Sequence, residues 1–362
     1  MFGFLVGVKG LGEGFELLGA DVLDAIFVAT RNPFMGLIVG ILATTVMQSS
    51  SVTTAVIVGL VAAPESPLPL VSAVPMIMGA NIGTTVTATI VSMVYMGRRA
   101  EFEKAFPVAV CHDLFNYATV VVLLPLELAT GYLRRTAVTL ASVLEGAGGY
   151  DYESPFAGAL ALALAPVERA AAWLFPVEQL QGFVLIAFSG GLIVTMLFTL
   201  VKVMRSLVQT RVEHLIRTVL GSSAVLSILT GIVVTAMVQS SSVTTSLLVP
   251  LGAAGLLRLE QALPITIGAN IGTTVTALLA ALAVSGPNAI YGLQIALVHL
   301  VFNLTGMLVI YPLQITRRVP LASARYVTKL ALRSRKWTMF WVVALFYGVP
   351  ALLLFVDRLL RQ

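Results

Sequence analysis

Charged residues are scarce in this sequence, at 11% of 362 residues, whereas soluble domains carry about 25%. Hydrophobic residues make up 58%, and the mean hydropathy is +0.97. Much of this excess lies in apolar runs at 106–126, 181–201, 290–312 and 338–356. Each run is long enough to span a bilayer, which needs about 20 residues. These features predict an all-α polytopic membrane protein with the lipid bilayer as its solvent.

Cysteine is nearly absent as well. Cys111 is the single one, so an internal disulfide is excluded. The first residues lack a basic segment and a small-residue cleavage site, and no cleavable signal peptide is expected. The formal net charge is +5, but the cations lie in short loops beside apolar runs. Cations in such loops set membrane orientation, so nucleic acid is not an expected partner.

Three polar blocks occur twice, in the same order. QSSSVTT occupies 48–54 and 239–245, and GANIGTT occupies 79–85 and 268–274. The third block is CHDLFN at 111–116, which returns as VHLVFN at 298–303. The offsets are 191, 189 and 187 residues (239 − 48, 268 − 79 and 299 − 112), which indicates a duplication.

Each copy is predicted to have three parts. The first is a hairpin with QSSS at its tip, at 34–63 and 223–257, with arms too short to cross about 30 Å of hydrocarbon. We therefore expect re-entrant helical hairpins. The second part is a helix over 70–96 or 262–285, and we expect it to be unwound at GANIGTT because glycine and asparagine are poor helix formers. The third part is a full-length helix over 106–126 or 290–312.

Repeat order and charge together predict the topology. The first repeat covers 1–130, an extracellular linker with an interfacial helix near 156–174 covers 131–180, the second repeat covers 181–314, and a basic cytoplasmic segment and a final membrane helix cover 315–362. Fifteen cations fall on one side if each hairpin returns to its own side: Arg98, Arg99, Lys104, Lys202, Arg205, Arg211, Arg217, Arg258, Arg317, Arg318, Arg325, Lys329, Arg333, Arg335 and Lys336. The positive-inside rule makes that side cytoplasmic. The first hairpin then opens outward and the second inward, which is the inverted repeat of many secondary transporters.

The hairpin tips are predicted to bind a small tetrahedral oxyanion. Irregular backbone at membrane depth must line a cavity or be buried in protein. The helix after each QSSS begins with free N–H groups and a partial positive charge, and the serine hydroxyls add donors. The predicted anion ligands are Gln48, Ser49, Ser50, Ser51, Gln239, Ser240, Ser241 and Ser242. We expect both tips to converge near the bilayer midplane.

A cation is expected to offset the anion's charge, because no lysine or arginine occurs inside the six blocks and a lone buried ion is very costly. Sodium fits, since a hard cation favours amide, hydroxyl and backbone oxygens. The predicted ligands are Gln48, Gln239, Ser240, Asn81, Asn270, Thr84, Thr85, Thr273 and Thr274. Asp113, the one carboxylate in the blocks, shares a helix face with Asn116 and joins this set. The alternative roles are interhelical packing for the hydroxyls and an ion pair of Asp113 with Arg99 or Lys104.

Taken together, the paired blocks resemble the type II sodium/phosphate cotransporter family. The similarity runs over nearly the whole chain and is pronounced at 102–133 and 293–313. The resemblance implies phosphate import into the cell across the plasma (inner) membrane, driven by sodium, with one phosphate site shared by both tips. It also implies that Asn116, Thr273 and Thr276 are sodium ligands. Electrogenic members of the family have aspartate in HDxFN, as here at Asp113, which implies about three sodium ions per divalent phosphate. One departure is Arg98, which stands where a family sodium site has an acidic residue.

Other functions stay open at this point. A sodium-coupled transporter of sulfate or a carboxylate, or a non-transporting phosphate sensor, would use similar residues. A hydrolytic triad of Ser50, His112 and Asp113 is disfavoured, because adjacent helical residues point about 100° apart and Leu300 replaces the aspartate in the second copy. We therefore expect no enzyme activity and no organic cofactor, only co-transported sodium.

Overall fold

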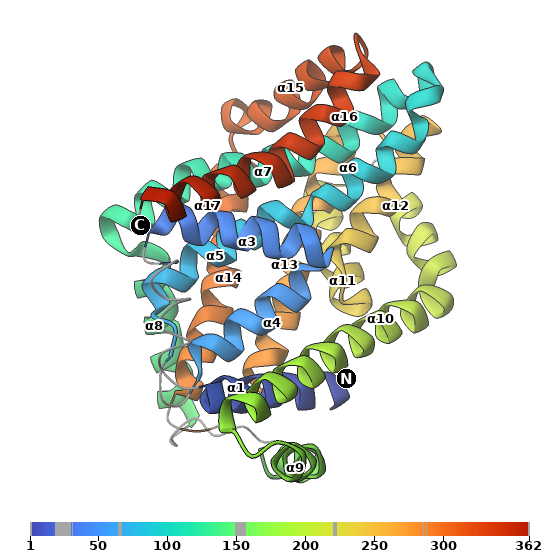
Figure 1. Ribbon diagram of the computed structural model, residues 1–362. Helices are drawn as coiled ribbons and strands as arrows, with labels where there is room; N and C mark the ends of the chain where they lie inside the picture. The colour runs from blue at the N-terminus through green and yellow to red at the C-terminus, as the bar shows by residue number, and fades with distance from the viewer. Residues whose placement is uncertain are drawn as a thin grey trace.

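A computed structural model describes residues 2–18, 30, 32–63, 67–148, 157–219, 223–284, 286 and 288–360. Within these residues the chain forms helices, turns and no strand (Figure 1). Among the described residues, five helices are long and apolar enough to cross a membrane by length and composition, namely Leu70–Gly97, Arg99–Thr130, Glu178–Thr199, Leu259–Ala281 and Ala289–Ile310. The prediction of an all-helical protein with several potential membrane spans is confirmed.

Two short helical hairpins occupy the predicted positions. The first consists of α3 (Pro33–Met47) and α4 (Ser50–Val61), and the second of α11 (Ala224–Val238) and α12 (Ser241–Ala253). Asn32 and Ser223 begin them as N-caps, accepting hydrogen bonds from the backbone N–H groups of Phe34 and Leu226. The longest arms have 15 residues, about 22 Å, which is short of a hydrocarbon core of about 30 Å.

Glycines allow the first arm of each hairpin to lie directly against the GANIGTT helix of its own repeat. A Cβ built at Gly79 would lie 2.0 Å from the carbonyl oxygen of Leu37, and one at Gly268 would lie 2.0 Å from that of Ile228. Close backbone approach through small residues is typical of packing between membrane helices. The same contact is therefore made in both repeats, by α3 against α5 (Leu70–Thr84) and by α11 against α13 (Leu259–Ala281).

The predicted unwinding at GANIGTT is not observed. In the second copy α13 continues through 268–274 without interruption. In the first copy α5 continues to Thr84, and only Thr85 separates it from α6 (Val86–Met93). The physical reason is that these glycines allow close contact between helices instead of breaking the helix, so the prediction from helix propensity was wrong.

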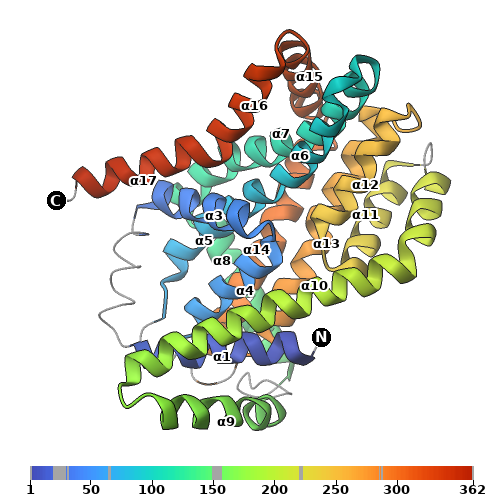
Figure 2. The same cartoon turned by 45° about the vertical axis from the view of Figure 1, so that its right-hand side comes forward.

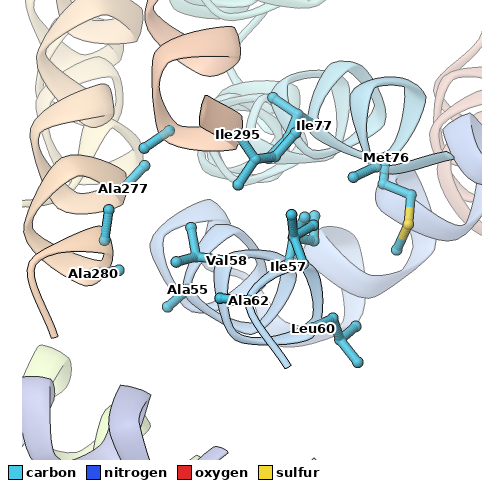
Figure 3. Close-up of a cluster of buried hydrophobic side chains, with 14 of the residues drawn as sticks. Ala55, Ile57, Val58, Leu60, Ala62, Met76, Ile77, Ala277, Ala280 and Ile295 are labelled. Atoms are coloured by element: carbon cyan, nitrogen blue, oxygen red, sulfur yellow. The ribbon is translucent and has the colours of Figure 1, made fainter. Parts of the chain in front are cut away.

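The second arm of each hairpin packs against the other repeat. α4 contacts α13 and α14 (Ala289–Ile310), while α12 contacts α6 and α7 (Arg99–Thr130). Figure 3 shows Ala55 and Val58 of α4 beside Ala277 and Ala280 of α13. Each hairpin therefore bridges the two repeats through its second arm.

The remaining helices surround this centre. α1 (Phe2–Leu18) lies along α10 (Glu178–Val219) in Figures 1 and 2. α9 (Ala157–Leu174) lies at the position where a linker helix was predicted. α8 (Tyr132–Gly148), which packs on α14, was not predicted within the linker. The linker residues 149–156, and the side chains of Arg205, Arg211 and Arg217, lie outside the described part.

The C-terminal segment is helical but not one regular helix. α15 (Gln314–Ala331) is followed by α16 (Arg335–Val343), a π-helical turn η2 (Ala344–Gly348) and α17 (Val349–Leu360). The predicted final membrane helix therefore contains a π-turn. The basic helix α15 and the linker helix α9 lie at opposite ends of the molecule in both views (Figures 1 and 2).

Candidate functional site

The first hairpin turns at Gln48 and Ser49. Gln48 ends α3 in the left-handed conformation, with φ 52° and ψ 24°. Ser49 is extended and caps α4, since its hydroxyl oxygen accepts a hydrogen bond from the backbone N–H of Val52 at 3.3 Å. The Gln48 side chain folds back and donates to the carbonyl oxygen of Thr45 at 2.5 Å. Together these bonds fix the turn and direct the N-terminus of α4 toward the tip.

The turn of the second hairpin has nearly the same backbone φ and ψ angles as the first. Gln239 has φ 58° and ψ 27°, and Ser240 caps α12 through a 3.3 Å bond from Val243 N–H. Among the described residues, Gln48 and Gln239 are the only non-glycines with positive φ. The left-handed conformation costs about 1–2 kcal/mol per residue, and such strain is concentrated at functional sites.

The two tips meet inside the protein. Ser51 Oγ donates to the backbone carbonyl oxygen of Gln239 at 3.3 Å and lies 3.4 Å from Thr276 Oγ1. Thr276 in turn donates to Gln239 Oε1 at 2.8 Å. On the other side, Ser242 Oγ lies 3.5 Å from the carbonyl oxygen of Thr84. QSSS tips and GANIGTT helices from both repeats therefore share one location.

Burial at this location is uneven. Ser50, Ser51, Ser241 and Gln239 are buried, whereas Ser49, Ser240 and Ser242 are half-buried. Gln48 is exposed, although its counterpart Gln239 is only 6% exposed. The location is thus more open beside the first tip than beside the second.

The threonines of both GANIGTT blocks are buried and bond to their own helices. Thr84 and Thr273 donate to carbonyl oxygens four residues earlier, at 2.8 and 2.9 Å. Thr85 and Thr274 donate to carbonyl oxygens three residues earlier, at 2.8 and 2.7 Å. Because the hydroxyl hydrogens are used in this way, the oxygen lone pairs stay available to a cation.

Asparagine and histidine side chains connect the repeats reciprocally. His112 Nε2 lies 2.6 Å from Asn270 Oδ1, and His299 Nε2 lies 3.3 Å from Asn81 Oδ1. Asn116 joins both sides, because its Nδ2 donates to the Asn81 carbonyl and its Oδ1 accepts from Asn270 Nδ2, each at 2.6 Å. These buried side chains form one polar network at the centre of the protein.

Asp113 is held by Thr89. The Thr89 hydroxyl lies 2.9 Å from Asp113 Oδ2 and 3.2 Å from Oδ1. The ion pairs found in the described part are Lys9–Glu13, Arg98–Glu101 and Arg325–Glu260, so the alternative pairing of Asp113 with Arg99 or Lys104 is not seen there. Asp113 is 6% exposed, which places a carboxyl group within a potential membrane span.

Three contacting residues were not predicted. Thr87 donates to Gln48 Oε1 at 3.1 Å, just as its counterpart Thr276 does to Gln239, and the repeat symmetry would have found it. Thr89 and Tyr347 lie outside the repeated blocks, and repeat symmetry does not indicate either residue. Tyr347 lies on the π-turn, where its hydroxyl is 3.4 Å from Gln48 Nε2 and donates to the Thr45 carbonyl at 3.3 Å.

The arrangement joins two kinds of ligand chemistry. Two helix N-termini and several hydroxyl groups favour an anion, and neighbouring amide and hydroxyl oxygens favour a hard cation. In the part of the chain that the structure describes, no group of three histidine, cysteine, aspartate or glutamate side chains is placed to hold a metal ion. A cation would therefore be bound mainly by neutral oxygens, and Asp113 is the one residue of the repeated blocks that could add a carboxylate.

An all-helical fold with several potential membrane spans among the described residues is typical of polytopic membrane proteins. The sequence model of the Na+/Pi-cotransporter family matches residues 4–145 and 192–322. The chain therefore belongs to the Na+/Pi-cotransporter family, as the sequence resemblance predicted. The two matched stretches begin 188 residues apart (192 − 4), close to the offsets of the three blocks.

Curated relatives agree with this membership. The chain is 33% identical to sodium-dependent phosphate transport protein 2A of Rattus norvegicus, over 96% of this chain and 65% of the relative. It is 30% identical to sodium-dependent phosphate transport protein 2B of Homo sapiens, over 97% of this chain and 63% of the relative. The chain thus spans slightly less than two thirds of these relatives. No solved structure matches it significantly.

Proposed function

We propose that this protein is a secondary active symporter that imports inorganic phosphate together with sodium. The observation that carries the proposal is the direct contact between the two QSSS tips, through Ser51 and Gln239. Each tip ends in a helix N-terminus, and none of the blocks contains lysine or arginine. Such a site attracts an oxyanion but does not neutralise it, which calls for a co-transported cation. The names of the curated relatives support phosphate and sodium as the pair.

Phosphate is proposed to bind between the tips. The N–H groups that begin α4 and α12, and the hydroxyls of Ser49–Ser51 and Ser240–Ser242, supply the donors that phosphate oxygens accept. Gln48 and Gln239 hold the turns and contribute amide groups. The burial of Ser50, Ser51 and Ser241 supports this placement, because hydrogen bonds to a charged acceptor are strong where water is excluded.

Sodium is proposed to bind the oxygen-rich surfaces around the same tips. The proposed ligands from the second repeat are Thr273, Thr274, Thr276, Asn270, Gln239 and Ser240, and those from the first repeat are Asn81, Thr84, Thr85 and Gln48. A further ion is proposed at Asp113 and Asn116, giving about three sodium ions per divalent phosphate. Transport is then electrogenic, and the second repeat cannot supply an equivalent site because Leu300 replaces the aspartate.

Alternating access is proposed to arise from two inverted repeats, at 1–130 and 181–314, in a plasma or bacterial inner membrane. The equal backbone contacts of α3 with α5 and of α11 with α13 support the repeat relation. The opposite locations of α15 and α9 support cytoplasmic basic loops and an outer linker (Figure 1). Each second arm packs on the other repeat, so motion of one repeat displaces a tip relative to its partner.

Labelled phosphate uptake into proteoliposomes tests the function. We expect uptake with a sodium gradient and none with choline, because sodium offsets the anion's buried charge. Ser241→Leu places an apolar side chain between the tips, where Ser241 is 2% exposed, and should abolish uptake. The matched control is Ser142→Leu on the exposed surface of α8, which should transport normally.

The same assay separates the alternative functions. Uptake of labelled sulfate or dicarboxylate in place of phosphate would move the assignment to another anion. Sodium-dependent phosphate binding without uptake would identify a sensor. Equal phosphate uptake in sodium and in choline would contradict sodium coupling, since the tips would then bind phosphate without a counter-ion.

A further inference from the structure

A cavity with a few polar side chains in a mostly apolar lining lies away from the QSSS tips. It has a volume of about 890 Å³ and is lined by the start of α5, by α8 and by the first turns of α14. Its chemically distinctive lining residues are Arg134, Arg135, Tyr291 and Gln294. No residue of either QSSS block lines it. Under the proposed topology, the beginnings of α5, α8 and α14 all lie on the outer side.

The two arginines hold their guanidinium groups close together. A Cβ built at Gly131 would lie 3.0 Å from Arg134 Nη2 and 3.5 Å from Arg135 Nε. These two nitrogens are therefore no farther apart than the sum of those distances. Neither arginine takes part in an ion pair found within the described residues. Two cations side by side repel each other, and an anion between them relieves that repulsion.

One carboxylate already lies nearby but leaves a positive excess. Glu127 is 7% exposed, and its Oε2 accepts a hydrogen bond from the backbone N–H of Leu133 at 2.6 Å. Glu127 thus caps the N-terminus of α8 and interacts electrostatically with both arginines. Two guanidinium groups against one carboxylate leave one positive charge at the cavity. The start of α5, at Leu70, has no side-chain cap and adds a positive helix end.

Gln294 supplies an independent indication of what the cavity binds. The side chain is 8% exposed, and its Oε1 has no hydrogen-bond partner. A buried acceptor without a donor is costly, and a ligand that brings a donor removes the cost. Inorganic phosphate near neutral pH carries both negative charge and at least one P–OH group. Sulfate carries charge but no such donor, so Gln294 favours phosphate over sulfate.

We propose that this cavity is an outer binding site for inorganic phosphate, distinct from the tip site. Arg134 and Arg135 bind the negatively charged oxygens, and Gln294 accepts a hydrogen bond from P–OH. Placing the cavity on the outer side rests on the proposed function, whereas phosphate binding to it does not. A membrane lipid also carries a phosphate group, but a phosphodiester lacks P–OH and leaves Gln294 Oε1 without its donor.

The two sites differ in their need for sodium, and this difference makes the test specific. The outer site carries its own cations, so it binds phosphate in choline, whereas the tip site requires sodium. Line broadening in the 31P NMR spectrum of inorganic phosphate, with purified protein in lipid-free maltoside detergent, reports weak binding. We expect broadening in choline for the wild type and for Ser241→Leu, and at least about tenfold weaker binding for the double variant Arg134→Gln/Arg135→Gln.

Controls separate charge at this cavity from charge in general. Arg169→Gln, on the exposed surface of α9, removes one positive charge elsewhere, as Arg135→Gln does at the cavity, and should keep the broadening. Arg135→Gln alone changes an exposed side chain, which guards against misfolding of the double variant, and should weaken binding by a smaller factor. Gln294→Leu should weaken phosphate binding about tenfold while leaving the affinity for sulfate unchanged, so sulfate should displace phosphate more effectively than it does from the wild type.

Three results would overturn the proposal. Unchanged broadening in the double variant would show that the arginines do not bind phosphate. Equal competition by sulfate in wild type and Gln294→Leu would refute the role of Gln294. Displacement of phosphate by phosphatidylglycerol, with lipid retained by wild type but not by the double variant, would identify a lipid site. Loss of sodium-dependent binding in Ser241→Leu tests the tip site separately.

Discussion

Substituting Gly79 by alanine tests the close contact between α3 and α5. The new Cβ would lie 2.0 Å from Leu37 O and 2.9 Å from Ile41 N, both backbone atoms of α3. Cβ contacts under 3.0 Å essentially never occur, so α3 must withdraw by at least 1.0 Å (3.0 − 2.0). A backbone atom cannot change rotamer to escape. We therefore expect the upper end of the usual cost of overpacking, about 3 kcal/mol.

Thermal unfolding in detergent measures this cost. For a chain of this length, 1 kcal/mol shifts the midpoint by about 2 °C, so Gly79→Ala should lower it by about 6 °C. Gly268→Ala should behave alike, because its Cβ would lie 2.0 Å from Ile228 O. Phosphate uptake should fall in both variants, since each displaced arm carries a QSSS tip. Gly190→Ala is the control, because nothing lies within 4 Å of a Cβ there.

Wild-type behaviour of both glycine variants would contradict the close contact between the arms and the GANIGTT helices. If Gly79→Ala and Gly268→Ala unfold at the wild-type temperature and transport at the wild-type rate, the arms do not approach the GANIGTT helices this closely. The account of these glycines as contact residues would then be wrong.

Three further predictions concern individual side chains. Asp113→Gly should keep phosphate uptake but lose phosphate-induced current in proteoliposomes, because the charge-carrying sodium loses its carboxylate; undiminished current would place that ion elsewhere. Tyr347→Phe removes hydrogen bonds to the first tip that are worth about 1 kcal/mol. Hydrogen exchange at Gln48 should therefore quicken about fivefold, and unchanged exchange would contradict the contact. The pKa of Glu168 is raised to about 7, first by its hydrogen bond with Glu13 and then by burial. Its folded-state pKa exceeds the ordinary 4.5, so the free energy of unfolding decreases as pH rises from 4.5 through about 7. Glu168→Gln should recover less than about 1 kcal/mol of that free energy at pH 8 and nothing at pH 4. Equal gains at both pH values would refute this.

The hairpins and their tips were predictable because duplication made their features visible twice. A pair of QSSS blocks at one offset, each between short apolar arms, predicts two similar turns, and the two left-handed glutamines are consistent with it. Repeat symmetry also predicts Thr87 once Thr276 is named. Pairing between blocks of opposite repeats could not be predicted in detail, because spacing along the chain does not determine which side chains meet.

Other features depended on contacts that the sequence does not display. The glycines of GANIGTT were interpreted through helix propensity, although their role is decided by α3 and α11 lying against them. Tyr347 reaches Gln48 from 299 residues away, through a π-turn for which no signal was recognised. Thr89 was overlooked because Leu278 stands at the corresponding position of the second copy, just as Leu300 stands for Asp113.

The reciprocal histidine–asparagine pairs have a consequence for biosynthesis. Asn270 follows His112 by 158 residues, and His299 follows Asn81 by 218. At about 5–20 residues per second, a ribosome needs about 8–30 s to supply the nearer partner. During that interval the first half has inserted with polar groups that only the second half can satisfy. Truncated chains therefore retain a buried polar defect, which gives membrane quality control a chemical mark of an unfinished molecule.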